Sequence, residues 1–171
     1  PKNLTRELFT YRGAGTLVRK GESINVFKDP DAETLAAVKD LVEHSFGRTL
    51  DDNWFERLDE PLVLLSETGR AAAVITRGVS GSPYHAKFVV TSVAQGEGLG
   101  AAIWQGVRAR YPALYWRSRN TNPVTSWYFL QADSSNRAGQ WVVFTIGVEG
   151  AAQRQSCVED ALLRDSGWIE E

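Results

Sequence analysis

One stretch of the chain joins a strand-like run to an amphipathic helix through a turn rich in glycine, and it limits the fold more than any other. It reads VVTSVAQGEGLGAAIWQGVRARY and spans residues 89–111. Its opening valines are typical of a strand, and the apolar spacing after residue 99 predicts a helix that ends at Arg110. Between the two elements lie Gly96, Gly98 and Gly100.

A glycine turn at the start of a helix suits an anion. Backbone N–H groups in the first helical turn have no partner inside the helix, and the positive end of the helix dipole lies beside them. Phosphate oxygens bind well at such a position when no side chain blocks the approach. A second interpretation stays open, in which the glycines only supply the positive φ that a sharp turn requires.

Nicotinamide dinucleotides are one class of phosphate ligand with a matching motif, because Gly96, Gly98 and Ala101 fit G-x-G-x-x-A. Three features argue against that class. The segment TSVAQ separates the strand from the first glycine, and the next predicted strand carries Arg117 and Arg119 where an acidic residue is expected. Too few residues then remain for a doubly wound sheet. The lysine-bearing loop of nucleoside triphosphatases does not occur in the sequence either.

The composition is that of one globular domain. With 171 residues, 43% of them hydrophobic and 23% charged, the chain can bury roughly two thirds of the surface of its unfolded form. The net charge of −2 gives no general attraction to nucleic acid or to membranes, and no apolar run is long enough to span a bilayer. The single cysteine, Cys157, rules out an internal disulfide and a cysteine-rich metal site. We therefore expect a cytoplasmic protein without a metal ion.

The chain divides into two parts of different composition. Residues 1–22 are basic and glycine-rich, with too few apolar residues for a core, and we interpret them as a linker or the tail of a preceding domain. The absence of methionine also favours a processed product or a piece of something longer. Residues 23–171 hold the globular domain.

The predicted elements alternate between strands and helices. An antiparallel hairpin over residues 62–77 leads into a strand, the glycine turn, a helix and another strand, which predicts an α/β fold with a mixed sheet. Predicted strands cover residues 24–27, 62–67, 71–77, 84–90, 113–119 and 140–148, and predicted helices cover residues 32–46, 51–58, 99–110, 126–131 and 152–165.

The loop from Gln95 to Gly100 has the pattern Q-x-x-G-x-G and resembles the pyrophosphate loop of the GCN5-related N-acetyltransferase (GNAT) superfamily. There the loop follows the fourth strand and opens the third helix, in agreement with the predicted order. The resemblance implies a GNAT fold, a mixed central sheet flanked by helices, with acetyl-CoA or CoA bound by the loop amides and along the preceding strand. The residues implied at this cosubstrate are Phe88, Val89, Val90, Gln95, Gly96, Glu97, Gly98, Leu99, Gly100 and Ala101.

A narrower resemblance covers residues 24–148. The segments YHAKFVV, QGEGLGAAIW, LYWRSRNTNPVTSWYFLQADSS and GQWVVFTIG resemble the acetyltransferase domain of vertebrate-like N-acetylglutamate synthases and of bacterial bifunctional N-acetylglutamate synthase/kinases. The resemblance implies acetyl-CoA:L-glutamate N-acetyltransferase activity for arginine synthesis. It also implies an amino-acid-kinase domain before this one, whose end GAGTLVRKGE resembles, and a homo-oligomer in the full-length chain.

Two arginines indicate an acidic substrate without help from the family. Arg117 and Arg119 are two residues apart on a predicted strand, so their side chains project from one face. Guanidinium groups bind carboxylates through paired hydrogen bonds. The alternative is a solvated strand end with no ligand. Glutamate has two carboxylates, and further cations are available at Lys87 and Arg48, both of which the resemblance implies at the glutamate site.

The resemblance implies Phe88 beside the same substrate, and one neighbouring position departs from the family. The relatives usually have an acid where this chain has Ala86, which bears on how Lys87 is oriented.

We expect the amine of glutamate to attack the acetyl thioester directly, since Cys157 and the two histidines form no recognisable nucleophile–base pattern. Backbone N–H groups of residues 88–90 would stabilise the oxyanion, as in the superfamily. Tyr128 is the expected general acid toward the CoA thiolate, and Asn122 is expected to hydrogen-bond substrate or cosubstrate. The alternative for Tyr128 is simple packing with its aromatic neighbours.

A function of a different class remains open. The chain would then be a regulatory CoA-binding module, attached to a kinase and catalytically silent.

Overall fold

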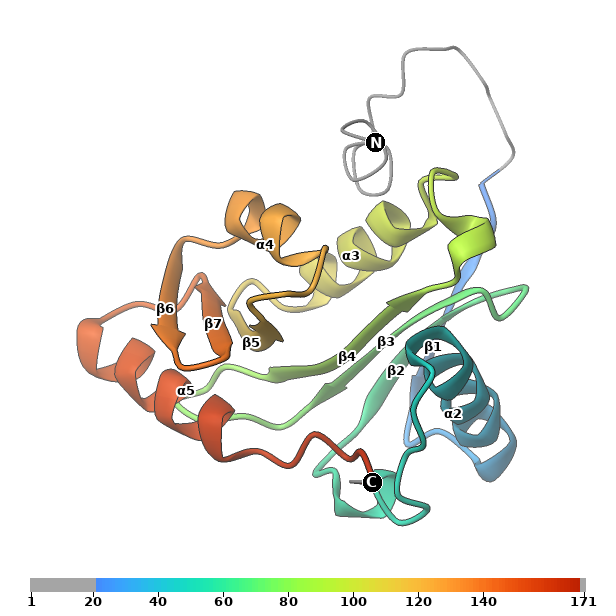
Figure 1. The fold of residues 1–171 in the computed structure, drawn as a ribbon, viewed down its shortest axis with the longest axis horizontal. Coiled ribbons are helices and arrows are strands. Elements are labelled where there is room, and N and C mark those ends of the chain that lie inside the picture. The colour runs from blue at the N-terminus through green and yellow to red at the C-terminus, as the bar shows by residue number, and fades with distance from the viewer. Residues whose placement is uncertain (1–20, 170–171) are drawn as a thin grey trace.

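The computed structural model describes residues 21–169, which form a seven-stranded mixed sheet with helices on both faces (Figure 1). The strand order is β1-β2-β3-β4-β5-β7-β6. The strands are β1 Ile24–Lys28, β2 Leu62–Ser66, β3 Ala71–Thr76, β4 Tyr84–Val90, β5 Leu114–Arg119, β6 Ser134–Ala138 and β7 Trp141–Ile146. The helices are α2 Ala32–Phe46, α3 Leu99–Arg110, α4 Thr125–Gln131 and α5 Ala151–Leu163, with 3₁₀ turns η1 Phe55–Arg57 and η2 Ser92–Ala94. The predicted α/β class with a mixed sheet is confirmed.

The sheet is antiparallel except at its centre, where β4 and β5 run parallel. Within the described residues 21–169, the ladder between these two strands consists of one pair, Tyr84 opposite Tyr115. Both residues lie at or near the start of their strands, and β4 and β5 separate from there toward their carboxyl ends (Figure 1). The β5-facing edge of the rest of β4 therefore has no ladder partner in β5.

A β-bulge in β4 accompanies this separation. Val74 of β3 pairs with Lys87, but its neighbour Ile75 pairs with His85, so Ala86 is an extra residue on β4. A bulge bends the strand and changes the side to which a side chain points. Ala86 packs against the cores under α2 and α5, and Lys87 also lies on that side, beside Trp54.

Each face of the sheet has its own core. On one face α2 packs through Val38 and Val42, and α5 packs farther along through its own apolar residues. On the other face α3 packs through Ile103 and Val107, next to α4. Asp31 caps the start of α2, because its side chain accepts a hydrogen bond from the N–H of Thr34 at 2.8 Å.

Two elements differ from the sequence prediction. Residues 51–58 were predicted as a short helix, but only the 3₁₀ turn η1 forms there. The strand β6 was not predicted, because its sequence SSNRA is polar and lacks an apolar alternation. As an edge strand that pairs only with β7 among the described strands, it needs little apolar surface.

Residues Asp165–Ile169 form a C-terminal strap that runs from the end of α5 back across the sheet to the loop after α2 (Figure 1). Backbone hydrogen bonds of 2.8 and 3.0 Å join the strap to residues 49–51. Arg57 also joins these two segments, because its guanidinium binds Asp51 at 2.9 Å and Asp165 of the strap at 2.7 Å. The sequence prediction left the role of this segment open.

Gly167→Ala is expected to destabilise the fold strongly. Gly167 has φ +78° and lies against the Trp54 ring, so an added Cβ would be 2.3 Å from Trp54 Cδ1. Gly139→Ala is the matched control, because φ there is +58° but no atom lies within 4 Å of the added Cβ. We expect a loss in unfolding free energy of about 1 kcal/mol for Gly139→Ala and about 3 kcal/mol for Gly167→Ala, measured by urea unfolding. Equal losses would contradict the close approach of the strap.

Candidate active site

The glycine loop leads from β4 through η2 into the N-terminus of α3. Gly96 and Gly98 have φ of +87° and +79°, and Gly98 is the N-cap of the helix. A Cβ added at either glycine would meet nothing within 4 Å, so the backbone conformation, and not crowding inside the protein, calls for glycine here. The positive φ that the second interpretation invoked is therefore real, and the side where the Cβ would lie is open.

The loop amides fall into two groups. The N–H groups of Gln95 and Glu97 donate to Thr91 and Ala94 carbonyls at 3.1 and 3.2 Å, so these two shape the turn. In α3 the first hydrogen bond from residue i to i−4 is donated by Ala102 to Gly98, at 3.0 Å. The N–H groups of residues 99–101 precede that bond, and they are the ones that the helix itself leaves for an anion.

The acidic side chain in the loop is neutralised by the protein. Glu97 accepts from Arg70 at 2.9 Å, and the same guanidinium binds Glu22 at 2.7 Å. Arg70 lies just before β3, so the β2–β3 hairpin supports the loop. A negative charge that would repel a phosphate group is thereby paired.

Phe88 and Tyr128 lie in an aromatic cluster on the α3 and α4 side of the sheet. The Phe88 ring is parallel to that of Trp127, with centroids 6.0 Å apart and an interplanar angle of 8°. Tyr128 is 5% exposed and packs against Trp116 and Phe144, with centroids at 5.3 and 5.6 Å. Burial raises the pKa of the Tyr128 phenol well above its ordinary value, so the phenol keeps its proton at neutral pH.

Asn122 lies in the turn between β5 and α4. Its N–H donates to the Arg119 carbonyl at 3.0 Å, and its Oδ1 accepts from the N–H of Val124 at 3.2 Å. Both bonds shape the turn that starts α4. The side-chain amide is half-buried, on the connection that carries Tyr128.

Lys87 is the most buried cation of the predicted set, at 8% exposure. Its Nζ donates to the Ser166 carbonyl at 2.6 Å and lies 3.9 Å from the centre of the Trp168 ring. Burial lowers the pKa of Lys87 to about 7, helped by the positive charges of Arg48 and Arg117 and opposed by Asp165. The three predicted cations Lys87, Arg48 and Arg117 therefore influence one another across β4, β5 and the loop after α2.

Arg117 and Arg119 project to the same face, as predicted, and both guanidinium groups lie over the Trp141 ring, at 4.2 and 5.3 Å from its centre. Arg117 also donates to the last carbonyls of α5, namely those of residues 161, 162 and 164, at 2.8, 3.3 and 2.6 Å. The predicted anion between the two arginines is thus partly replaced by a helix C-terminus, where a cation is favourable. Arg119 is exposed.

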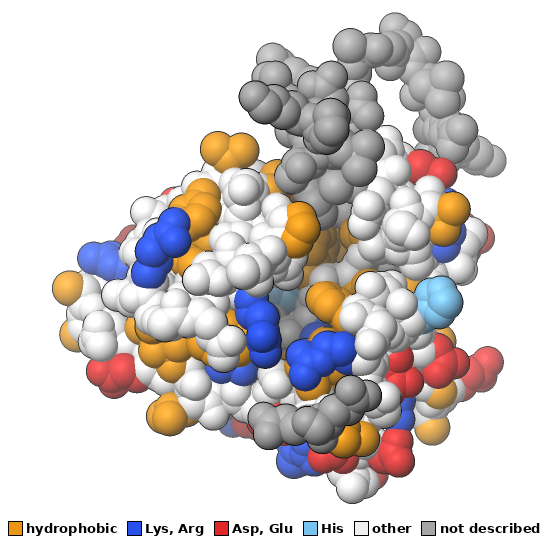
Figure 2. Space-filling model, in the orientation of Figure 1, with side chains coloured by type: hydrophobic (Ala, Val, Ile, Leu, Met, Phe, Trp, Pro, Cys, Tyr) orange, Lys and Arg blue, Asp and Glu red, His pale blue; other side chains and the backbone are white. Residues whose placement is uncertain are grey.

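Figure 2 shows Lys and Arg side chains gathered near the middle of this face of the molecule, around a hollow. The contacts described above bring the predicted cations together from three segments. They are Arg48 after α2, Lys87 on β4, and Arg117 and Arg119 on β5, with Trp168 of the strap between Arg48 and Lys87. An excess of positive charge at the mouth of a hollow attracts an anionic ligand.

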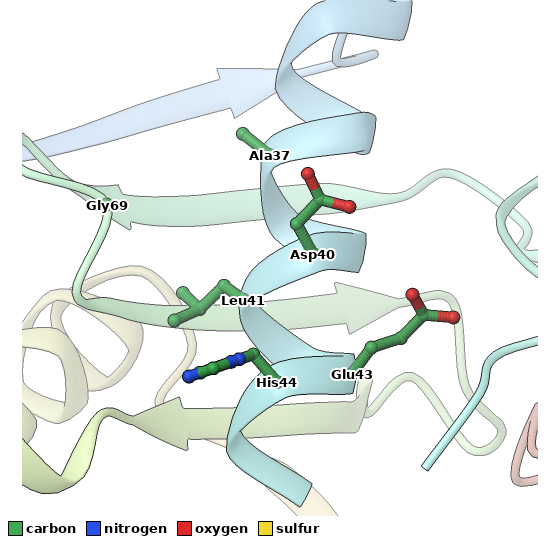
Figure 3. Close-up of a pocket in the computed structure, with 6 residues that line it drawn as sticks. All are labelled: Ala37, Asp40, Leu41, Glu43, His44 and Gly69. Atoms are coloured by element: carbon green, nitrogen blue, oxygen red, sulfur yellow. The ribbon is translucent and has the colours of Figure 1, made fainter. Parts of the chain in front are cut away.

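A second hollow, of 660 Å³, lies beside α2 (Figure 3). It is lined by Ala37, Asp40, Leu41, Glu43, His44 and Gly69. None of the predicted site residues is among them. Its two carboxylates also make it a poor place for an anion.

The sequence analysis missed the aromatic partners of the cations. Trp54, Trp141 and Trp168 each lie within 5.0 Å of a predicted cation, and the Ser166 carbonyl binds one directly. The contact with Trp141 could not be predicted, because it depends on how β5 pairs with β7, and no local sequence pattern gives that pairing. The tryptophan near the end of the chain was visible, but no local pattern indicates that the strap returns to residue 50.

His85 is a further residue that the prediction left aside. It follows Tyr84 on β4, is 4% exposed, and packs against the Trp104 ring with centroids 5.9 Å apart. Among the described residues neither ring nitrogen has a partner at good hydrogen-bond geometry, and the backbone group of Lys87 has only a weak effect on the ring. Burial lowers the pKa of His85 to about 4, so the imidazole is neutral at pH 7.

Among residues 21–169 no helix is long and apolar enough to cross a membrane. No group of three or more His, Cys, Asp or Glu side chains in this described part is placed to hold a metal ion.

Comparisons with known proteins match most of the described residues. The N-acetyltransferase domain of N-acetylglutamate synthase, as a family, matches residues 20–163. Acetylglutamate kinase of Xanthomonas campestris pv. campestris is 40% identical over 168 residues, 96% of this chain and 39% of that protein. The mitochondrial N-acetylglutamate synthase of Danio rerio is 39% identical over 165 residues, 92% of this chain and 31% of that protein. This chain thus spans less than two fifths of either relative.

Solved structures share the fold at much lower identity. An acetyltransferase of the GNAT family from Staphylococcus aureus has a TM-score of 0.54 and 9% identity, over 72% of this chain and 99% of that one. The predicted GNAT fold is confirmed.

His85→Leu is expected to stabilise the protein, because it removes two unpaired polar atoms from the core at similar volume. The pKa of His85 is about 4 in the folded state and 6.5 ordinarily. Between these two pH values the unfolded chain therefore binds a proton at His85 and the folded chain does not. Wild-type stability should fall as pH falls from 6.5 toward 4, and the variant should lose that slope.

Urea unfolding at pH 7, 6, 5 and 4 measures both effects, and we expect a gain of about 1–2 kcal/mol at pH 7. His44→Gln, at an exposed position on α2, is the control and should keep the wild-type slope. A slope that survives in His85→Leu would mean that another group causes it.

Proposed function

Because this chain belongs to the family of N-acetyltransferase domains of N-acetylglutamate synthases, we propose that it transfers the acetyl group of acetyl-CoA to the α-amine of L-glutamate. One observation carries the proposal. The strands β4 and β5 separate, the first leads into the open amides at the start of α3, and together they carry Lys87, Arg117 and Arg119. A site for a diphosphate and a site for a dicarboxylate then adjoin one opening.

Acetyl-CoA would bind with its pyrophosphate at the amides of residues 99–101 and within the loop from Gln95 to Ala101. Its pantetheine would follow residues 88–90, where β4 has no ladder partner in β5. The unpaired edge offers N–H and C=O groups to the amides of pantetheine, much as a strand would. No metal ion takes part in this scheme.

Glutamate would be held by its two carboxylates. Lys87 and Arg119 are the donors with free capacity, with Arg48 beside Lys87 across the Trp168 ring. Arg117 would contribute charge while it holds the end of α5. Phe88, packed on the opposite side of the sheet, would bound the reacting end of the site.

The chemistry is a direct acyl transfer. The neutral amine attacks the thioester carbonyl, the C–S bond breaks, and the amine loses a proton to water. N–H groups of residues 88–90 would stabilise the oxyanion, and Tyr128, which is protonated at neutral pH, would give its proton to the leaving thiolate and take one back from solvent. Asn122 would orient substrate or cosubstrate from the turn before α4. Cys157 is buried and its pKa is raised by burial, which does not suit a nucleophile.

A catalytically silent CoA-binding module is the second candidate. The contact of Arg117 with the α5 carbonyls favours it, since a guanidinium used in this way has fewer donors for a substrate. The assay described next separates the two.

The wider context is also a proposal. The relative named acetylglutamate kinase supports an amino-acid-kinase domain before residue 23, and we propose a homo-oligomer for such a chain. A cytoplasmic location is consistent with the free thiol of Cys157.

Purified protein mixed with acetyl-CoA and L-glutamate should release free thiol and form N-acetylglutamate in equal amounts. Tyr128→Phe should lower kcat about 100-fold and leave the KM of both substrates nearly unchanged, because the ring remains and only the proton-donating hydroxyl is lost. CoA should raise the melting temperature where NADPH does not. Binding of CoA without turnover would favour the silent module, and unchanged turnover in Tyr128→Phe would remove this residue from the mechanism.

Arg119→Ala and Arg117→Ala should differ in a defined way. Each removes a cation from the carboxylate site, so each should raise the KM for glutamate about 10-fold or more with little change for acetyl-CoA. Arg117→Ala should in addition lower the unfolding free energy by about 2 kcal/mol, because the α5 carbonyls lose their donor. Steady-state kinetics and urea unfolding measure the two effects. A KM change confined to acetyl-CoA would contradict the assignment.

A further inference from the structure

The C-terminal strap covers the buried lysine of the candidate site. Trp168 lies between two cations, with its ring centre 3.9 Å from Lys87 Nζ and 4.8 Å from Arg48 Cζ. The Ser166 carbonyl accepts from the same Nζ at 2.6 Å. Lys87 is thus oriented by a segment that lies 79 residues away in the sequence.

The strap is built to stay in this position. Two backbone hydrogen bonds to residues 49–51, which together make the bridge between Leu50 and Trp168, fix its course. Phe46 packs on the Trp168 ring with centroids 5.4 Å apart. A tryptophan that is held from both sides presents the face of its ring to a cation in a defined direction.

The groups that hold Lys87 are neutral. Within residues 21–169 no carboxylate forms an ion pair with Lys87, and Asp165, the acid that acts on it electrostatically, is bound by Arg57. The other charged groups that act on Lys87 are Arg48 and Arg117, both positive. A buried cation without a counter-ion is costly, and an anion that reaches it binds strongly.

The hydrogen-bond donors of Lys87 also indicate that it can bind an anion. An ammonium group has three N–H donors, and the Ser166 carbonyl takes one of them. The ring of Trp168 stabilises the charge but accepts no conventional hydrogen bond. At least one donor of the protonated lysine therefore remains for a ligand. Ala86, the neighbour on the bulge, offers no carboxylate to take it.

We propose that Trp168 is a substrate-positioning residue, which with the Ser166 carbonyl orients Lys87 toward a carboxylate of glutamate and makes the C-terminal strap one wall of the substrate site. The assignment rests on the proposed function. It gives the end of the chain a role in selecting an acidic acceptor, without contact with the thioester.

Trp168→Leu and Trp168→Phe test the proposal in steady-state kinetics. Loss of the ring face in Trp168→Leu should raise the KM for glutamate about 5- to 30-fold, while kcat and the KM for acetyl-CoA stay within about twofold. Trp168→Phe keeps an aromatic face and should raise the same KM only about two- to threefold. Titration calorimetry with N-acetylglutamate should show the same order of affinities. Leu163→Ala, at an 87% exposed position just before the strap, is the control and should behave as wild type.

The outcomes separate the two proposals. Wild-type protein that neither acetylates glutamate nor binds N-acetylglutamate overturns the proposed function, and with it the role of Trp168. Active wild-type protein with an unchanged glutamate KM in Trp168→Leu overturns the role of Trp168 alone. So does a loss in kcat with an unchanged KM, since that would not come from carboxylate binding. If Trp168→Leu does not unfold cooperatively, a wild-type glutamate KM in Trp168→Phe overturns the proposal.

Discussion

The extra residue in β4 is the constraint from which the site follows. Because Ala86 has no partner on β3, the strand bends there, and Lys87 lies on the α2 and α5 side instead of facing the aromatic cluster. The same strand separates from β5 after one pair of residues. In an unbroken strand the alternation counted from His85, which packs on Trp104, would have placed Lys87 on the α3 side and Phe88 on the other side. The bulge thus places a buried lysine in the part of β4 that has already separated from β5.

Electrostatics in the opened region are arranged in opposite ways at its two ends. At the glycine loop the one acidic side chain is paired with Arg70, so the helix amides present an undiminished positive end. At the cationic end the positive charges are surrounded by indole rings and carbonyl groups, which stabilise a charge without cancelling it. Both arrangements leave positive charge unpaired, which is what the proposed sites for a diphosphate and for carboxylates require.

Local sequence signals were sufficient for most of the fold. The bounds of β4 were predicted to the residue, and the helix after the glycine turn was predicted at residues 99–110, because the apolar period, the glycines and the flanking valines agree there. The strand β6 was missed since an exposed edge carries no such period. The bulge was also out of reach, because it is defined by the pairing with β3 and not by the sequence of β4.

The residues of the candidate site could be predicted from the sequence, but their contacts could not. Side chains that share a strand or a loop with a motif were identified, as with Arg117 and Arg119, which do lie on one face. The groups that contact each cation were not identified from the sequence, because they come from the C-terminal end of the chain. The α5 carbonyls that Arg117 binds and the ring that covers Lys87 belong to the last helix and the strap. Sequence spacing carries no information on contacts between segments so far apart.

The neutral surroundings of Lys87 make its burial costly in free energy. Folding removes the ammonium from water and gives it one carbonyl and two indole rings, which replace only part of its hydration. The native state without a ligand is therefore less stable than the same backbone would be with an apolar side chain at this position. If a carboxylate binds at Lys87 as proposed, it would restore part of the lost hydration, and the stability given up in folding would be recovered as affinity for the substrate.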